Sequence, residues 1–170
     1  MTNHSFKNFA LKLMVAISLP LLATTVLAQD VGSIAPDITL PGAKDPVKLA
    51  DFKDKVVYVD FWASWCGPCK QSFPFMNTMQ KKYKAQGFEV IAVNVDATTT
   101  DATTFLTKVP ATFTIAFDPK GETPKRYKLK AMPSSYLIGR DGKVLAVHQG
   151  FKAEDTVDLE KRIAQALMIK

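Results

Sequence analysis

The apolar residues of this chain fall into runs that alternate between strand-like and helix-like patterns. The segment KVVYVDFWA, residues 55–63, is a continuous β-branched and aromatic run, and FEVIAVNVD, residues 88–96, is a second one. Runs of this kind predict strands that are buried on both faces. A helical pattern begins near Cys66, and Gly87 is placed to end it. A strand, a helix and a second strand in this order favour a right-handed crossover with parallel pairing.

The next stretch of the chain continues this alternation. Thr100 or Asp101 is placed to cap a short helix, and TFTIAF at residues 112–117 predicts another strand. A turn sequence follows, after which Thr123-Pro124 matches the pattern of a cap residue followed by proline at a helix start. We therefore expect a further helix and strand followed by one short helix.

The C-terminal part predicts antiparallel strands and a final helix. SSYLIG and KVLAVHQ flank Arg140-Asp141-Gly142, which is typical of a hairpin turn. From about Ala153 the apolar positions indicate a helix with one buried face, to which we assign Val157, Ile163 and Leu167.

Ahead of the first long strand, residues 36–41 and 47–49 predict two short strands around a Gly-containing turn. Together these elements predict an α/β domain with a central mixed β-sheet, helices on both faces and an N-terminal β-hairpin extension. The sequence contains no internal repeat and no linker, so we expect one domain.

The N-terminal segment has a different character from the rest. The segment begins with the basic residues Lys7 and Lys12, and its first acidic residue is Asp30. An apolar run between them ends in a small residue, Ala28. This pattern is typical of a signal peptide over residues 1–28, cleaved near Ala28, with the mature domain over residues 29–170. The alternative is an uncleaved N-terminal membrane anchor.

The overall charge adds little to this interpretation. The formal net charge of the 170 residues is +6, without a tract of lysine and arginine. Such a modest excess argues only weakly for nucleic acid or an acidic membrane surface, and we expect no nucleic-acid partner. We expect the mature protein to be a monomer.

The chain has two cysteines, Cys66 and Cys69, separated by Gly67 and Pro68. A structural disulfide is one reading, but closing so small a loop removes little chain entropy from the unfolded state. Thiol–disulfide exchange, by contrast, needs an attacking thiolate and a second thiol close by. At the start of a helix, unpaired N–H groups would lower the pKa of Cys66.

Metal and haem chemistry fit the sequence poorly. A zinc site requires four ligands, and beyond the N-terminal segment the chain offers two cysteines and one histidine, His148. Covalent haem attachment needs histidine directly after the second cysteine, where Lys70 stands instead. We therefore expect no metal and no cofactor.

An acidic residue, Asp60, lies within the apolar strand that leads to the cysteines. Burial disfavours the ionised carboxylate, so we predict a raised pKa with desolvation as its main cause. A carboxyl group of this kind could exchange a proton with Cys69 during catalysis. The alternative is a purely structural hydrogen bond near the end of the strand.

The segment VDFWASWCGPCK, Pro74 within the following helix, and Met132-Pro133 before a strand together resemble the thioredoxin superfamily. The chain is most similar to the exported TlpA-like and ResA-like thiol:disulfide reductases. The resemblance covers nearly all of the mature chain and implies the thioredoxin fold. Ala92 stands where thioredoxin keeps a lysine near its buried aspartate.

The resemblance also implies roles for individual residues. It makes Cys66 the nucleophile, Cys69 the resolving thiol and Asp60 the catalytic acid–base group, and it implies a cis bond between Met132 and Pro133. The implied substrate-binding residues are Trp65, Gly67, Pro68, Met132 and Pro133.

The implied activity is that of a periplasmic thiol:disulfide oxidoreductase that mainly reduces disulfides of extracytoplasmic client proteins. Gly67-Pro68 carries no ionisable group that would stabilise the reduced form, which favours the reductase direction. Such a protein needs an upstream thiol electron donor, expected in the membrane. The alternatives are a disulfide oxidase or isomerase, and a client-binding module for cytochrome c maturation or folding.

Overall fold

The computed structural model describes Met1 and residues 31–169; apart from Met1, the predicted signal peptide lies outside the described residues. The core is a five-stranded mixed sheet in the order β5-β4-β3-β6-β7. β4 pairs parallel with β3 and β5, whereas β6 pairs antiparallel with β3 and β7. The strands are β3 (Val56–Trp62), β4 (Phe88–Asn94), β5 (Thr114–Phe117), β6 (Ser134–Ile138) and β7 (Val144–Gln149). The predicted mixed sheet is therefore confirmed.

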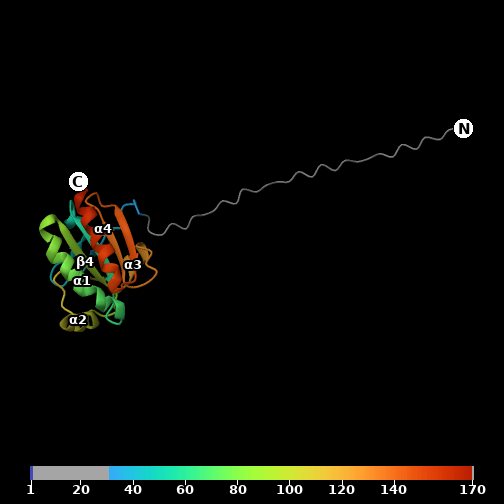
Figure 1. The fold of residues 1–170 in the computed structure, drawn as a ribbon. Helices are drawn as coiled ribbons and strands as arrows, with labels where there is room; N and C mark the ends of the chain where they lie inside the picture. Colours follow the sequence, from blue (N-terminus) through green and yellow to red (C-terminus); the bar gives the residue numbers. More distant parts are fainter. Residues whose placement is uncertain (2–30, 170) are drawn as a thin grey trace.

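Helices cover both faces of this sheet (Figure 1). One face carries α1 (Gly67–Tyr83), α2 (Thr99–Lys108) and α4 (Thr156–Met168), and the opposite face carries α3 (Glu122–Arg126). The described residues also form three short 3-10 helices: η1 (Leu49–Phe52), η2 (Lys84–Gln86) and η3 (Ala153–Asp155). Within residues 31–169, no helix combines the length and the apolar character that a membrane span requires.

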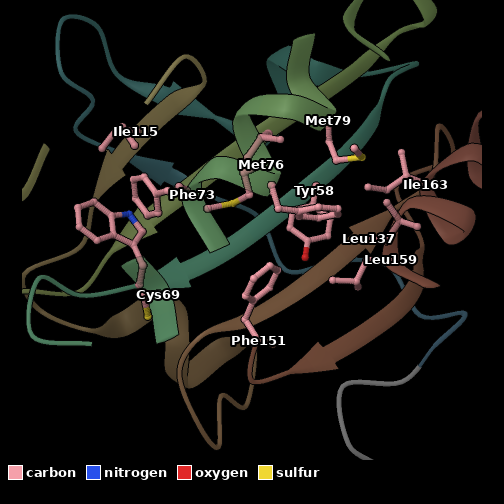
Figure 2. Packing of buried hydrophobic residues seen from close by; sticks show 14 of the residues in the cluster. Tyr58, Cys69, Phe73, Met76, Met79, Ile115, Leu137, Phe151, Leu159 and Ile163 are labelled. Carbon is pink, nitrogen blue, oxygen red and sulfur yellow. The ribbon is translucent and has the colours of Figure 1, made fainter. Parts of the chain in front are cut away.

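Alternation along β3 divides the core into two layers. Val57, Val59 and Phe61 pack into the layer beneath α3, whereas Tyr58 and Trp62 pack into the layer beneath α1 and α4. Figure 2 shows the second layer, in which side chains from α1 and α4 meet those of the sheet. Because successive strand residues point to opposite faces, Asp60 faces the α1 side.

The N-terminal extension is a two-stranded antiparallel sheet of β1 (Thr39–Leu40) and β2 (Val47–Lys48). Its strands are shorter than predicted, because the proline residues at 36 and 41 lack the N–H that a ladder needs. The carbonyl of Pro41 accepts a hydrogen bond of 2.8 Å from the N–H of Phe117. The hairpin thus covers part of the edge strand β5.

Two helix caps differ from the predictions. Thr98, and not Thr100 or Asp101, caps α2, because its hydroxyl accepts a hydrogen bond from the N–H of Asp101 at 3.4 Å. Thr123 lies inside α3 and does not cap it. The carboxylate of Asp118 accepts a 2.6 Å hydrogen bond from the Thr123 N–H, so the preceding turn supplies the acceptor.

The buried face of α4 also differs from the prediction. Leu159, Ile163 and Ala166 are buried, whereas Val157 is 78% exposed. Val157 and Ile163 are six positions apart, which at about 3.6 residues per turn places them on different sides of a helix. The assignment of Val157 to the core was therefore wrong.

Candidate active site

Cys66 and Cys69 lie at the beginning of α1 and form a disulfide with a Cα–Cα distance of 5.3 Å. Cys66 is the cap residue in an extended conformation, and Pro68 lies in the first turn, where no backbone donor is needed. The N–H of Cys69 donates a hydrogen bond of 3.3 Å to the sulfur of Cys66. Negative charge developing on that sulfur would be stabilised by this donor and by the helix dipole.

The two sulfurs differ in access to solvent. Cys66 keeps 6% of its surface exposed, whereas Cys69 is fully buried. Trp65 beside them is 70% exposed, and Gly67 and Pro68 are exposed as well. An incoming sulfur atom would therefore reach Cys66 first.

A buried carboxylate holds the loop before Cys66. Asp96 accepts hydrogen bonds from the backbone N–H of Ser64 at 3.0 Å and from the Ser64 hydroxyl at 3.0 Å. The side-chain amide of Asn94 donates a third bond of 2.8 Å to the same carboxylate. The sequence analysis did not identify this support, although two polar residues at the end of a buried strand were a usable signal.

We predict that Asp96→Ala lowers the free energy of unfolding of the oxidised protein by about 2–3 kcal/mol, because it leaves the Ser64 N–H without its charged acceptor. Ser64→Ala removes only the hydroxyl bond and should cost about 1 kcal/mol. Urea unfolding measures both values. Equal losses for the two variants would show that the carboxylate does not hold the loop.

The Met132–Pro133 peptide bond is cis. β6 begins directly after it, and Ser134 of β6 pairs with Phe61 near the end of β3. The cis bond therefore lies at the edge of the sheet where β3 leads to Cys66. Met132 is partly buried and Pro133 is buried.

Gly150 fixes this segment from the other side, because its N–H donates a 2.8 Å hydrogen bond to the carbonyl of Pro133. Its φ of +82° is a conformation that favours glycine. Sequence reasoning did not identify Gly150 as part of the site.

Asp60 is 2% exposed, and one of its carboxyl oxygens, Oδ2, has no hydrogen-bond partner among the described residues. Its strand neighbours are Ala92 on β4 and Ser135 on β6. Burial raises the pKa of this carboxyl group well above its ordinary value. This confirms the predicted burial, the direction of the pKa shift and its cause.

His148, the histidine weighed as a metal ligand, lies on β7, and its Nε2 contacts the carboxylate of Asp155 at 3.2 Å. Among Met1 and residues 31–169, no group of three or more histidine, cysteine and acidic side chains could hold a metal ion.

A cysteine pair at a helix start and a cis-proline directly before β6, on a mixed sheet of this order, define a thioredoxin-fold thiol:disulfide oxidoreductase. A family model described as Redoxin matches residues 30–166. The chain therefore belongs to the Redoxin family.

Similar proteins are named for thiol–disulfide exchange. The thiol-disulfide oxidoreductase ResA of Bacillus thuringiensis subsp. konkukian is 38% identical over 131 residues, covering 75% of this chain and 73% of the relative. ResA of Bacillus subtilis is 33% identical over 127 residues, covering 74% and 71%.

A solved structure assigned to a thiol:disulfide interchange protein DsbE from Chlorobium tepidum is 61% identical, with a TM-score of 0.80. It covers 81% of this chain and 98% of that chain. These relatives and the cysteine pair establish thiol:disulfide oxidoreductase activity of the ResA and DsbE type.

Proposed function

We propose that this protein reduces disulfides of client proteins outside the cytoplasm. The observation that carries the proposal is the pair of sulfurs at the start of α1, one accessible and one fully buried. The direction is supported by Gly67-Pro68, which places no ionisable group between the cysteines. Without such a group the reduced form gains no extra stabilisation, and the dithiol is the better electron donor.

The reaction begins with the reduced protein. The Cys66 thiolate attacks one sulfur of the client disulfide, so that the client S–S bond breaks and a mixed disulfide forms. The released client thiolate takes up a proton. Cys69 then loses its proton and attacks Cys66, which forms the Cys66–Cys69 disulfide and releases the second client thiolate. Two electrons pass from the dithiol to the client.

Asp60 is the candidate proton acceptor for Cys69. Its carboxyl group lies on the face of β3 that packs against α1, and burial raises its pKa. The ionised carboxylate is therefore a stronger proton acceptor than an exposed one. A group of this kind can take the thiol proton during resolution and return it in the reverse direction.

Client segments would dock on the exposed residues Trp65, Gly67 and Pro68. We assign Met132 and Pro133, which are joined by the cis bond, to the same docking surface. An extended client chain could pair with the backbone of Met132, in the manner of an added strand.

Each cycle leaves the protein oxidised, so an upstream thiol donor has to reduce it again. An exported protein cannot draw directly on cytoplasmic reductants, and we therefore place that donor in the membrane. The predicted signal peptide over residues 1–28 supports export to the periplasm.

The reduction potential of the Cys66–Cys69 pair tests the direction. Equilibration of the full chain with glutathione buffers should give a value near the roughly −270 mV of thioredoxin, and catalytic reduction of insulin disulfides should be measurable. A potential near about −120 mV would identify an oxidant. Absence of insulin turnover at a low potential would favour a client-binding module.

A further inference from the structure

A groove of about 410 Å³ lies beside the redox-active disulfide. One wall is the loop that carries Trp65 and Cys66, and the other wall is α2. Phe105 and Val109 give the groove partly buried apolar surface. Because Cys66 lines the groove, any segment bound in it lies next to the sulfur that takes part in the mixed disulfide.

The groove carries an excess of positive charge. Lys70 and Lys108 line it, both are exposed, and neither makes an ion pair within the described part of the chain. By contrast, Lys82 and Lys125 each contact a carboxylate elsewhere on the surface. Unpaired lysines at a groove are available for an anionic ligand.

The other charged group of the groove is Asp101, in the first turn of α2. Its carboxylate accepts a 2.8 Å hydrogen bond from the hydroxyl of Thr98, so it takes part in the cap of its own helix. Asp101 and Lys108 are seven positions apart, which corresponds to about 10 Å along α2. An extended segment of about three residues spans that length.

The first turn of α1 adds to the positive potential. Gly67, the first residue of α1, also lines the groove, and the N-terminal end of a helix carries a partial positive charge. Two unpaired lysines and this helix end together outweigh the single carboxylate.

We propose that the groove selects client segments that carry an acidic side chain close to the disulfide cysteine. The acidic group pairs with Lys70 and Lys108, and an apolar neighbour packs against Phe105 and Val109. This inference rests on the proposed reduction of client disulfides and adds no chemical step to it; it states which clients react fastest.

Synthetic peptides that contain one intramolecular disulfide test the proposal. In one set Glu, Gln or Lys stands two residues before the first cysteine, and in a second set two residues after it. The rate of oxidation of the reduced full-length protein is measured for each peptide at low salt. In at least one of the two sets, we expect the Glu peptide to react about threefold faster than the Gln peptide, and the Lys peptide to react more slowly than the Gln peptide.

The variants assign this preference to the groove. Lys108→Gln and Lys70→Gln should each reduce the ratio of Glu to Lys rates, and Lys108→Arg should retain it. Lys120→Gln removes the same charge from an exposed turn outside the groove and should leave the ratio unchanged. The preference should also shrink as salt approaches 1 M.

The outcomes separate the two proposals. If all peptides oxidise the protein at the same rate, or if the ratio survives both lysine substitutions, the charge selection is refuted while the reductase function stands. Faster reaction of the Lys peptides would also refute it. If no peptide oxidises the reduced protein at all, the proposed function itself fails.

Discussion

Cys69→Ser is expected to accumulate a stable mixed disulfide with client proteins, whereas Cys66→Ser should form none. The expected difference follows from burial, because Cys66 keeps some exposed surface and Cys69 keeps none. In Cys69→Ser the first attack proceeds normally, but no second thiol remains to release the client. In Cys66→Ser the remaining thiol is enclosed beneath the helix start, where a client sulfur does not reach it.

Non-reducing electrophoresis and mass spectrometry of the trapped adducts measure this outcome. Both variants should lose at least about a hundredfold in turnover of insulin disulfides, since each lacks half of the exchange pair. The double variant provides the background for nonspecific adducts. Adducts that form through Cys69 in Cys66→Ser, in amounts equal to those of Cys69→Ser, would contradict the assigned order of attack.

The sequence predicted the fold well because its elements carry strong local patterns. β3 and β4 are continuous apolar runs, and they form the centre of the sheet in the structure. Cys66 and Cys69 were identifiable as an exchange pair because their spacing is combined with the surrounding segment VDFWASWCGPCK, Pro74 and Met132-Pro133.

Other features depended on contacts that no local pattern reveals. The support of the redox loop by Asp96 joins residues 64 and 96, which are distant along the chain. The role of Gly150 depends on a bond to Pro133, and the groove exists only because α2 packs beside the redox loop. In α4 the apolar residues do not all lie on one face of the helix, so the predicted burial of Val157 is wrong.

The burial of Asp60 has an energetic cost that its neighbours do not relieve. Ala92 on β4 offers no charge, and Ser135 on β6 offers a hydroxyl. Tyr58, two positions earlier on β3, has its own pKa raised by burial and, to a lesser extent, by the charge of Asp60. None of these side chains supplies a positive charge that would stabilise the ionised carboxylate.

This environment makes the stability of the protein depend on pH. The folded pKa of Asp60 lies above the unfolded value, so the folded state holds its proton more tightly than the unfolded state does. The free energy of unfolding contributed by this group is therefore greatest below the unfolded pKa. It falls as pH rises toward the folded pKa and levels off above it.

Asp60→Asn is expected to stabilise the oxidised protein at neutral pH by about 1–3 kcal/mol, because it removes a group that costs free energy when buried in its ionised form. The pH dependence described above should become weaker in the variant. Urea unfolding over a series of pH values measures both effects. Asp118→Asn is the matched control, since Asp118 is also buried but accepts a hydrogen bond from the Thr123 N–H. The control should not be stabilised.

The same substitution should slow resolution of the mixed disulfide by about a hundredfold, since asparagine cannot accept the proton of Cys69. Single-turnover measurements on a preformed mixed disulfide follow this step directly, and the control Asp118→Asn should resolve it at the wild-type rate. Greater stability combined with slower resolution would show that a destabilising group is retained for its proton chemistry. If Asp60→Asn gains stability but resolves the mixed disulfide at the wild-type rate at every pH, Asp60 is not the proton acceptor.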